Sequence, residues 1–346
     1  MEGPLLRPLP FRRQRSGGLT MGQTPNAKDR PYHRGVMIPE AVSLLAAAPP
    51  GLVVDATFGG GGHTEALLLA RPSDSVLAID RDPDAIANVP PEPRLRFVAG
   101  NFDELKHLLE ISTGRDQEPH EPCEDVGHSQ RVAGVLFDLG VSSHQLDVAA
   151  RGFSYRNQGP LDMRMDPNST LSAADLVNES SAVELERIFR RWGEERFARR
   201  IAQRIVAERP ITDTTHLAGV VADAVPAAAR RRRHPARRVF QALRIEVNDE
   251  LGALEHGLEA AIGALIPGGR VVVIAYHSLE DRLVKRRLAS GATGCTCPPD
   301  LPVCGCGTTS ELRLLTRGGV RPTPAEIEAN PRARSATLRA AEVIAG

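Results

Sequence analysis

The 346-residue sequence predicts an α/β fold: a Rossmann-like, mostly parallel sheet with an inserted all-helical domain. From residue 31 to 150, apolar strand-like runs alternate with helical patterns, which is typical of parallel β-α-β units. From residue 151 to 238 only helical patterns are present, and strand-like runs return between residues 239 and 346. We therefore expect a core in two parts, separated by a helical insertion.

Composition excludes several classes of protein. Lys plus Arg equals Asp plus Glu at 43 each, so a nucleic-acid surface would have to come from local clustering of charge. No apolar run approaches the roughly 18 residues of a membrane span. Residues 1–30 are polar, rich in Arg, Gly and Pro, and lack the apolar centre of a signal peptide, so we expect a disordered tail, with Met21 as an alternative start. The expected location is the cytoplasm, without membrane contact.

A glycine-rich turn follows the first predicted strand. Leu52–Thr57 is apolar and β-branched, four glycines follow Phe58, and a helical pattern covers Thr64–Ala70. Glycines let the backbone approach a ligand closely, and the helix that follows presents unpaired N–H groups. The next strand, Ser75–Asp80, ends in an acid about twenty residues further on, where such folds place a carboxylate on ribose hydroxyls. These features predict a ligand that contains adenosine.

The identity of that ligand depends on the spacing of the loop. The dinucleotide pattern G-x-G-x-x-G needs a third glycine at the helix start, where this chain has Thr64 after Gly59 and Gly61. Asp55 precedes the loop, and its charge would oppose a pyrophosphate but could accept from the ammonium of a methionyl group. The pattern favours S-adenosylmethionine, with a nicotinamide dinucleotide as the alternative.

Two later strands end in side chains suited to the same site. Leu95–Ala99 is followed by Phe102, whose ring could pack on an adenine or serve only as a core residue. Val132–Leu139 is a continuous apolar run that ends at Asp138, with Ser142 close behind. Ligands of open α/β sheets bind beyond the carboxyl ends of the strands, so Asp138 and Ser142 are expected at the mouth of the crevice.

The predicted insertion is helical and basic. Ser181 to Glu184 has the form of a capping box, and Thr214 or Thr215 is expected to cap another helix. Basic residues recur on the expected exposed faces, where they are either an RNA-binding surface or only solvated side chains. They are Arg190, Arg191, Arg196, Arg199, Arg200, Arg204 and the run Arg230–Arg233.

The core is expected to resume with one long helix, because apolar residues recur at steps of three and four from Phe240 to Ile262. A polar stripe without acids follows another face of this helix, at Arg237, Gln241, Arg244 and Asn248. Two strand-like segments, Leu312–Thr316 and Ser335–Val343, complete the predicted sheet.

The strand Arg270–Tyr276 ends at a motif with a partly structural explanation. Ser278 is predicted to cap the next helix, and Asp281 would support the N-terminus of that helix. His277 has no evident structural role, which makes it a candidate for chemistry.

Cysteines are grouped in one loop, where Cys295, Cys297, Cys304 and Cys306 form two C-x-C pairs. A thiolate metal site and reduced thiols of a surface loop are the alternatives, and C-x-C is tighter than the usual zinc pairing. We assign no metal ligand. Residues 114–129 are polar and acidic, carry the isolated Cys123, and are expected to form a surface insertion.

Seven motifs, in order, closely resemble the RsmH (MraW) family of bacterial small-subunit (16S) rRNA cytosine-N4 methyltransferases. They are D-A-T-F-G-G-G-G-H-T (55–64), D-L-G-V-S-S-H-Q-L-D (138–147), R-G-F-S-Y-R (151–156), L-D-M-R-M (161–165), F-Q-A-L-R-I-x-V-N-D-E-L (240–251), H-S-L-E-D-R (277–282) and N-P-R-A-R-S-A-x-L-R (330–339). His144 stands where the family motif commonly has proline.

The resemblance implies a class I S-adenosylmethionine-dependent methyltransferase core, interrupted by a helical domain that faces RNA, and a target cytosine in the decoding centre. Carried over by motif, the cofactor contacts would be Gly61, Gly62, His63, Asp80, Phe102, Asp138 and Gln145.

Transfer of a methyl group to an exocyclic amine requires an acceptor for the amine proton, and Asp138, Ser142 and His277 are the candidates. Methylation at carbon 5 would need a cysteine nucleophile, and Cys123 in an acidic loop is badly placed for that role.

A cytosine that enters such a crevice must be single-stranded or turned out of its helix. The candidate RNA contacts are Arg151, Tyr155, Arg156, Arg237, Arg244, Asn248, Arg332 and Arg334, with Phe153 as a further stacking ring. For Phe153 and Tyr155 the alternative is packing at the domain junction. Rival functions are a methyltransferase for another RNA or a small metabolite, and a non-catalytic ribosome assembly factor. The oligomeric state is open, a homodimer included.

Overall fold

The computed structural model describes residues 35–112, 131–230, 234–294 and 309–345. The predicted tail, the acidic segment 114–129, Arg231–Arg233 and all five cysteines lie outside these residues. The alternatives for the clustered thiols therefore stand as the sequence left them.

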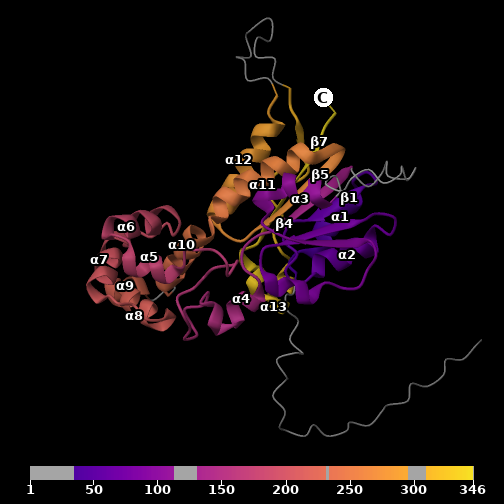
Figure 1. The fold of residues 1–346 in the computed structure, drawn as a ribbon. Helices are drawn as coiled ribbons and strands as arrows, with labels where there is room; N and C mark the ends of the chain where they lie inside the picture. Colours follow the sequence, from indigo (N-terminus) through magenta and orange to yellow (C-terminus); the bar gives the residue numbers. More distant parts are fainter. Residues whose placement is uncertain (1–34, 113–130, 231–233, 295–308, 346) are drawn as a thin grey trace, which may run out of the picture. The chain divides into compact units, whose positions relative to one another are not determined.

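Among the described residues, seven strands form one sheet in the order β3-β2-β1-β4-β5-β7-β6 (Figure 1). The strands are β1 (Leu52–Asp55), β2 (Val76–Asp80), β3 (Leu95–Ala99), β4 (Val132–Asp138), β5 (Leu265–Ala275), β6 (Leu312–Leu314) and β7 (Thr337–Val343). Strands β1 to β5 pair in parallel, whereas β7 runs antiparallel to β5 and β6. This order, with one reversed strand, is that of class I methyltransferases, so the predicted fold class is confirmed.

Helices cover both faces of the sheet. On one face lie α1 (Ile38–Ala46) and α2 (Gly62–Ala70), and on the other lie α3 (Leu105–Ser112), α11 (Glu250–Ala264) and α12 (Ser278–Ala292). Successive strand residues point to opposite faces, so the apolar run of β4 supplies Leu136 to the first core and Phe137 to the second. Polar side chains are thereby left to the strand ends, where the site is built.

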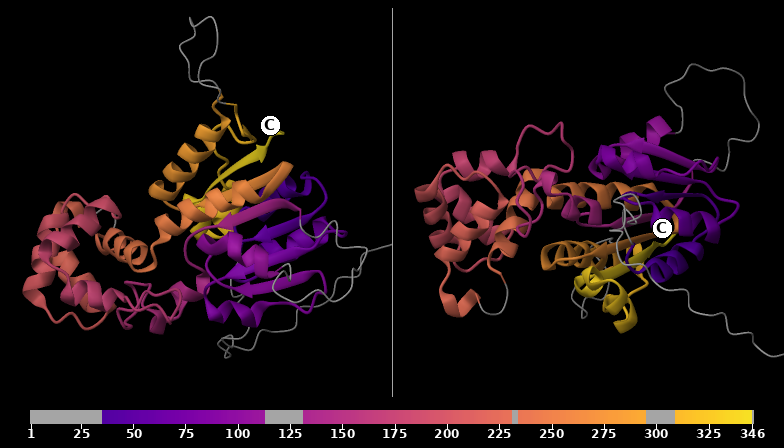
Figure 2. Two further views of the ribbon diagram at one scale, coloured as in Figure 1. Left: turned by 45° about the horizontal axis from the view of Figure 1, so that its top comes forward. Right: turned by 90° about the horizontal axis from the view of Figure 1, so that it is seen from below.

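The helices of the insertion gather beside the sheet (Figure 2), and their apolar core, from Phe153 to Val247, is separate from the clusters on the sheet. Its helices are α5 (Ala173–Glu179), α6 (Ala182–Arg191), α7 (Ala198–Glu208), α8 (Thr214–Ala224), α9 (Ala227–Arg230) and α10 (Ala236–Asn248). The capping box at Ser181 is confirmed, but Asp213, and not a threonine, caps α8.

The prediction of one long helix after residue 239 is wrong. The chain forms α10 and α11 with a break at Asp249, which adopts the left-handed conformation at φ 44°. Apolar side chains of α10 pack in the helical insertion, whereas those of α11 pack on the sheet. The insertion therefore ends at the break and not at residue 238, and apolar spacing alone could not show this because it continues through Asp249.

Two smaller features complete the core. Pro267–Gly269 lies within β5, where the pairing with β4 shifts register, and not in a turn before the strand. Short helices α4 (Ser143–Asp147) and α13 (Pro324–Ala329) lie at loops near the carboxyl ends of β4 and before β7. Within the described residues, no helix is long and apolar enough to cross a bilayer.

Candidate active site

A cavity opens at the carboxyl ends of the parallel strands. The polar lining comes from the ends of β1, β2, β3 and β4 and includes Gly59, Asp80, Asn101, Asp138, Ser142 and Gln145, whereas His277 after β5 does not line the cavity. The predicted crevice is therefore present, and it brings together side chains that are far apart in the sequence.

The glycine loop is shaped by backbone conformations that favour glycine. Gly59 has φ 52° and Gly61 has φ 78°, and a Cβ on Gly61 would lie 3.0 Å from the Phe58 ring. Gly61 precedes the first turn of α2, which Gly62 and His63 begin. Gly59 lines the cavity, whereas Gly61 and Gly62 form the turn behind it.

Asp80 fixes this loop to the end of β2. One carboxylate oxygen accepts from the Gly59 N–H at 2.7 Å, and the other accepts from the Asp82 N–H at 2.8 Å. Burial raises the pKa of Asp80 to about 6, against the two hydrogen bonds. The carboxylate faces the cavity, where two ribose hydroxyls would stabilise its charged form.

The end of β3 offers a place for a purine. Asn101 Oδ1 is buried, has no hydrogen-bond partner, and belongs to a residue that lines the cavity beside Phe102. An adenine amino group would satisfy this acceptor. The Phe102 ring also packs edge-on against Phe137, and α11 approaches it so closely that a Cβ on Gly257 would lie 2.7 Å from the ring. Phe102 is thus both a core residue and a wall of the cavity.

Asp138 is held at the end of β4 from three sides. The Tyr276 hydroxyl donates to Oδ1 at 2.7 Å, and the Asp138 N–H donates to Thr57 Oγ1. His63 Nδ1 lies 3.6 Å from Oδ2, and the other ring nitrogen of His63 is 3.1 Å from the Val36 carbonyl oxygen. Burial and the charge of Asp138 raise the pKa of Tyr276 well above its usual range, so the hydroxyl stays a donor. Oδ2 is the oxygen left for a ligand.

Two expected cofactor contacts lie deeper than predicted. Asp55 is fully buried, and its carboxylate accepts from the Thr57 N–H and the Thr64 hydroxyl. Burial also raises the pKa of Asp55, and the residue does not line the cavity, so the proposed bond to a methionyl ammonium is wrong. His63 is 4% exposed and contacts Asp138, behind the cavity wall.

Ser142 and Gln145 form a capping box at the start of α4. The Ser142 hydroxyl accepts from the Gln145 backbone N–H, and the side-chain Oε1 of Gln145 accepts from the Ser142 backbone N–H. Gln145 Nε2 donates to Asp82 at 2.7 Å. Ser142 lines the cavity near Asp138, but its oxygen already serves as an acceptor for the helix.

His277, and not Ser278, caps α12, so the predicted cap is wrong. His277 Nδ1 accepts from the Glu280 N–H, and in the neutral ring the proton therefore sits on Nε2. That nitrogen lies 3.1 Å from Glu280 Oε1, close enough for an ion pair but not aligned for a hydrogen bond. Because Nδ1 accepts from the backbone and Nε2 of the neutral ring carries the proton, His277 is a poor acceptor for a substrate proton.

Glu250, His277 and Glu280 place polar atoms within 4.8 Å of one another, in a combination that could suit a metal ion. However, Arg244 donates to both oxygens of Glu250 at 2.7 and 2.8 Å, which already neutralises that carboxylate. A protonated Nε2 of His277 also has no lone pair for a metal. We interpret the cluster as a charge-paired brace between α10, α11 and α12.

Several candidate RNA contacts are internal. Asn248 is 9% exposed and exchanges hydrogen bonds with the backbone of Met163 and Met165. Arg244 is engaged by Glu250, and Arg151 binds Asp82. The expected exposed stripe along this helix is therefore wrong: an acid from the next helix reaches Arg244, and of the stripe only Arg237 is exposed.

The two aromatic candidates also pack inward. Phe153 is buried in the helical core, and Tyr155 stacks on His234 and packs edge-on against Phe240. The predicted stacking role is wrong for Phe153, which has no face open to a base, and Tyr155 presents only part of its ring.

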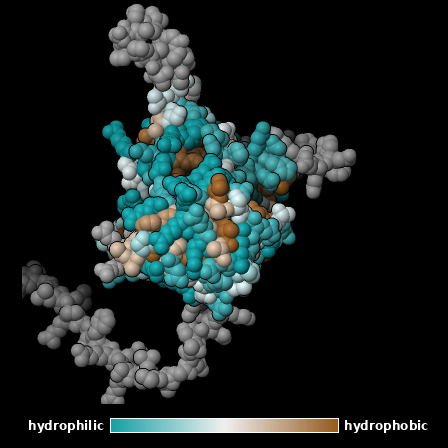
Figure 3. Space-filling model, turned by 90° about the vertical axis from the view of Figure 1, so that its left-hand side faces the viewer, coloured by the Kyte–Doolittle hydropathy of each residue, from teal (hydrophilic) through white to brown (hydrophobic). Residues whose placement is uncertain are grey.

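The other candidates lie at the surface. Arg156, Arg237, Arg332 and Arg334 are exposed, and of these Arg332 pairs with Asp147 at 2.7 Å. The basic residues predicted on α6 and α7 are exposed as well, on a side of the molecule that is mainly hydrophilic (Figure 3). These surface arginines stay predicted RNA contacts.

Sequence reasoning missed Tyr276 and Asp82, and it placed Asn101 only among the polar neighbours of Phe102 that could bond the edge of an adenine. Tyr276 ends an apolar strand and reads as one more core residue, although its hydroxyl reaches a carboxylate 138 positions away in the chain. The position of Asn101 directly after β3 was a usable signal, because parallel strands present ligands at this end. For Asp82, nothing local indicated partners in two later loops.

Comparison of the sequence with known proteins shows the family of this chain. Relatives named "Ribosomal RNA small subunit methyltransferase H" include that of Thermomicrobium roseum, 51% identical over 322 residues, which cover 90% of this chain and 94% of that protein. The relative from Acidothermus cellulolyticus is 50% identical over 324 residues, with coverage of 90% and 94%. The relative from Heliobacterium mobile is 45% identical over 323 residues, with coverage of 90% and 99%. The sequence profile of the MraW methylase family matches residues 30–344, and the chain belongs to that family.

Proposed function

We propose that this protein transfers the methyl group of S-adenosylmethionine to N4 of a cytosine in small-subunit (16S) rRNA, in the decoding centre. The names of its relatives support the rRNA substrate, and the cytosine-N4 target rests on the motif resemblance. The observation that carries the chemistry is the position of Asp138: its carboxylate shares one cavity with Asp80, and Oδ2 accepts no hydrogen bond, although His63 Nδ1 lies 3.6 Å from it. Such a substrate places the activity in the cytoplasm.

The residues of the cavity fit this cofactor. Asp80 would hold the ribose hydroxyls, Asn101 Oδ1 would accept from the adenine amino group, and Phe102 would flank the ring. The glycine loop leaves room for backbone approach to the ligand. When bound, the sulfonium supplies an electrophilic methyl group.

The role of Asp138 follows from the chemistry of the acceptor. The lone pair of an exocyclic cytosine amine is delocalised into the ring, so the amine is a poor nucleophile. A carboxylate oxygen that accepts an amine proton would localise that lone pair while the nitrogen–carbon bond forms and the carbon–sulfur bond breaks. Oδ2 of Asp138 can accept this proton, because Tyr276 occupies Oδ1. Alignment of the amine with the methyl group supplies the rest of the rate enhancement.

Asp138 is favoured over the other two candidates. Ser142 is engaged by the capping box, and both ring nitrogens of His277 face Glu280. We therefore reassign these two residues to the support of the cavity wall and of α12.

The rival functions differ in what the cavity would need. A non-catalytic assembly factor has no use for an acceptor carboxylate beside an intact ribose site, and both are present. A small metabolite would not require a separate helical domain with exposed arginines on α6 and α7. Both observations support the proposal.

The test is transfer of labelled methyl groups from S-adenosylmethionine to purified substrates. We expect small subunits from cells that lack this protein to accept label, and large subunits and fully methylated small subunits to accept none. Asp80→Ala should abolish transfer at a low cofactor concentration. Equal labelling of large and small subunits would contradict the proposal.

A further inference from the structure

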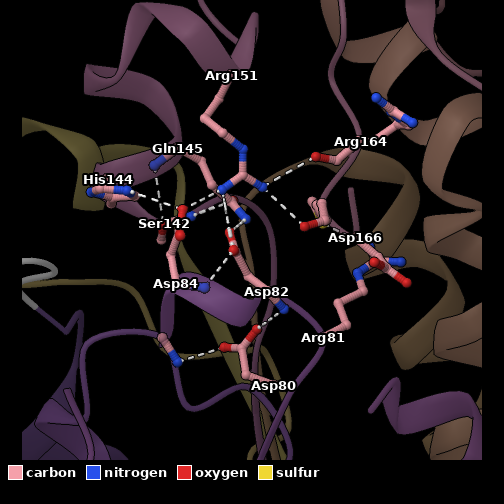
Figure 4. Close-up of polar contacts among 12 residues, drawn as sticks. Asp80, Arg81, Asp82, Asp84, Ser142, His144, Gln145, Arg151, Arg164 and Asp166 are labelled. Carbon is pink, nitrogen blue, oxygen red and sulfur yellow. Dashed lines mark hydrogen bonds and ion pairs between the residues drawn. The ribbon is translucent and has the colours of Figure 1, made fainter. Parts of the chain in front are cut away.

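The turn that follows the ribose carboxylate is the meeting point of four segments (Figure 4). Arg81 and Asp82 come directly after Asp80 at the end of β2, and both side chains point away from the strand into long-range contacts. Asp82 is only 3% exposed, which is rare for a carboxylate unless it is fully paired. The charge of Asp82 must therefore be paired with groups from other segments.

Asp82 binds two segments beyond β4. Its carboxylate accepts from Gln145 Nε2 at 2.7 Å and from Arg151 at 3.0 and 3.1 Å. Figure 4 shows the Arg151 side chain between Asp82 and the segment that holds Arg164. There its second terminal nitrogen donates to the carbonyl groups of Arg164 and Met165, at 3.2 and 2.9 Å. Arg151 thus ties the segment that enters the helical insertion to the cofactor strand.

Arg81 binds the segment that leaves the insertion. One of its terminal nitrogens donates to the carbonyl of Asn248, the last residue of α10, at 3.0 Å, and the other contacts the sulfur of Met165. Asn248 in turn donates to the Met163 carbonyl and accepts from the Met165 N–H. The entry and exit segments are therefore bonded to each other; Arg81 contacts both of them, whereas Asp82 binds only the entry segment, through Arg151.

A single hydrogen bond joins Asp82 to the carboxylate of the cofactor site. The Asp82 N–H donates to Asp80 Oδ1, the carboxylate that would receive the ribose hydroxyls. Hydroxyls that bind Asp80 would act on the same oxygens as the Asp82 N–H and the Gly59 N–H. A ligand there acts directly on the backbone of the turn, and through it on Gln145 and Arg151.

We propose that Asp82 and Arg151 are positioning residues that couple occupancy of the cofactor site to RNA binding by the helical insertion. This inference rests on the proposed function, because it requires both ligands. Binding of the adenosine ligand orders the turn at Asp82, and the turn sets the entry segment through Arg151 and the exit helix through Arg81. Coupling of this kind is reciprocal: each ligand strengthens the binding of the other by one common factor.

The test uses small ribosomal subunits purified from cells that lack this protein. The affinity of the full-length protein for these subunits is measured once without ligand and once with saturating S-adenosylhomocysteine. For wild-type protein we expect at least about fivefold tighter binding with the ligand, within the usual range of allosteric coupling. For Asp82→Asn, the ratio of the affinity for subunits with ligand to that without ligand should fall to about one. The affinity of this variant for S-adenosylhomocysteine alone should stay within about threefold of wild type.

Two further variants separate coupling from folding. Arg151→Lys keeps the charge but loses the two-nitrogen geometry, and it should reduce the ratio with a small change in melting temperature. Arg313→Gln removes an exposed arginine, which pairs with Glu342, from the edge strand β6, outside the insertion, and should leave the ratio unchanged.

The outcomes are distinguishable. A wild-type ratio near one with both ligands bound would overturn the coupling and leave the proposed function intact. Full coupling in folded Asp82→Asn and Arg151→Lys would overturn the role of these two residues. Wild-type protein that binds neither S-adenosylhomocysteine nor subunits would contradict the proposed function itself.

Discussion

The cofactor end of the sheet and the helical insertion use their polar residues in opposite ways. At the sheet, Asp80, Asp138 and Asn101 follow directly after strands and turn polar atoms into one cavity. In and around the insertion, Arg151, Arg244 and Asn248 turn inward and bind carboxylates and backbone of other segments. Polar residues thus make a ligand site in the first region and hold segments together in the second.

The difference shows which kinds of sequence pattern report a site. The carboxyl ends of parallel strands meet at one edge whatever the rest of the fold does, so a polar residue there has a known place. A polar residue on a helix faces solvent or another segment depending on packing that lies far away in the chain.

Asp138→Asn should reduce kcat by about 10²–10⁴-fold, because the amide cannot accept the amine proton. Affinity for S-adenosylhomocysteine should stay within about threefold, since shape and hydrogen bonding to Tyr276 are nearly kept. Single-turnover methylation of small subunits measures the first quantity and calorimetry the second. The matched control is Ser142→Ala, which should lose no more than about tenfold; a variant Asp138→Asn with more than a tenth of wild-type kcat would remove the acceptor role.

Arg151→Ala should destabilise the protein by about 3–5 kcal/mol, because it leaves Asp82 buried without its cation. Arg156→Ala, five positions away and exposed, should change stability by about 0.5 kcal/mol or less. Urea unfolding of both variants gives the comparison. If the two variants unfold at the same urea concentration, Arg151 is a surface residue in solution. It would then again be a candidate RNA contact.

Asp80→Ala should weaken S-adenosylhomocysteine binding by about 2 kcal/mol or more, roughly thirtyfold, through loss of charged hydrogen bonds to the ribose. Asp223→Ala, on the exposed end of α8, is the matched control and should bind normally. A dissociation constant within threefold of wild type would contradict the ribose assignment.

Cofactor affinity should also depend on pH through Asp80, whose pKa burial raises to about 6. Above pH 6 the carboxylate is charged and ready for ribose hydroxyls, whereas below pH 6 a proton must leave before binding. The dissociation constant should therefore rise by up to about tenfold per pH unit below 6. The folded pKa lies above the ordinary value of 3.8, so the contribution to stability has the opposite sign: it is fully present below pH 3.8 and is lost as pH rises through about 6. Calorimetry between pH 5 and pH 8 measures the dissociation constant of the cofactor. A dissociation constant that does not change with pH in wild type would contradict the titration of Asp80 in this range.

The smallest effect concerns RNA. Arg237→Ala combined with Arg334→Ala should lower the salt dependence of binding to small subunits by about two phosphate contacts, because both side chains are exposed. Arg244→Ala should leave the slope unchanged and lower stability instead, because Arg244 is paired with Glu250. A reduced slope for Arg244→Ala would restore the polar stripe as an RNA surface.

Much of the fold could be predicted from the sequence because its signals are local. Alternating strands and helices, the capping box at Ser181 and the turn before α2 each depend on residues within one element. The break at Asp249 escaped prediction because the apolar spacing of α10 continues into α11, and only tertiary packing assigns the two halves to different cores.

The site divides in the same way. Asp80 and Asp138 were predicted from their places after strands and line the cavity, whereas His277 was taken for a free residue because its capping bond to the Glu280 N–H is not visible as a motif. Asp55 was placed on a ligand by charge, but Thr57 and Thr64 satisfy it internally. Sequence reasoning thus located the edge of the sheet that binds a ligand, and it failed where a partner from elsewhere decides what a polar atom does.

The most direct test of methyl transfer beside Asp138 is the identity of the product nucleoside. Small subunits from cells that lack the protein would be incubated with wild-type enzyme and labelled cofactor, digested to nucleosides, and analysed by mass spectrometry after mapping of the labelled fragment. We predict one labelled N4-methylcytidine in a decoding-centre fragment, and its loss with Asp138→Asn. Label on carbon 5 of a pyrimidine, on a ribose, or at many unrelated positions would contradict an amine acceptor held at Asp138.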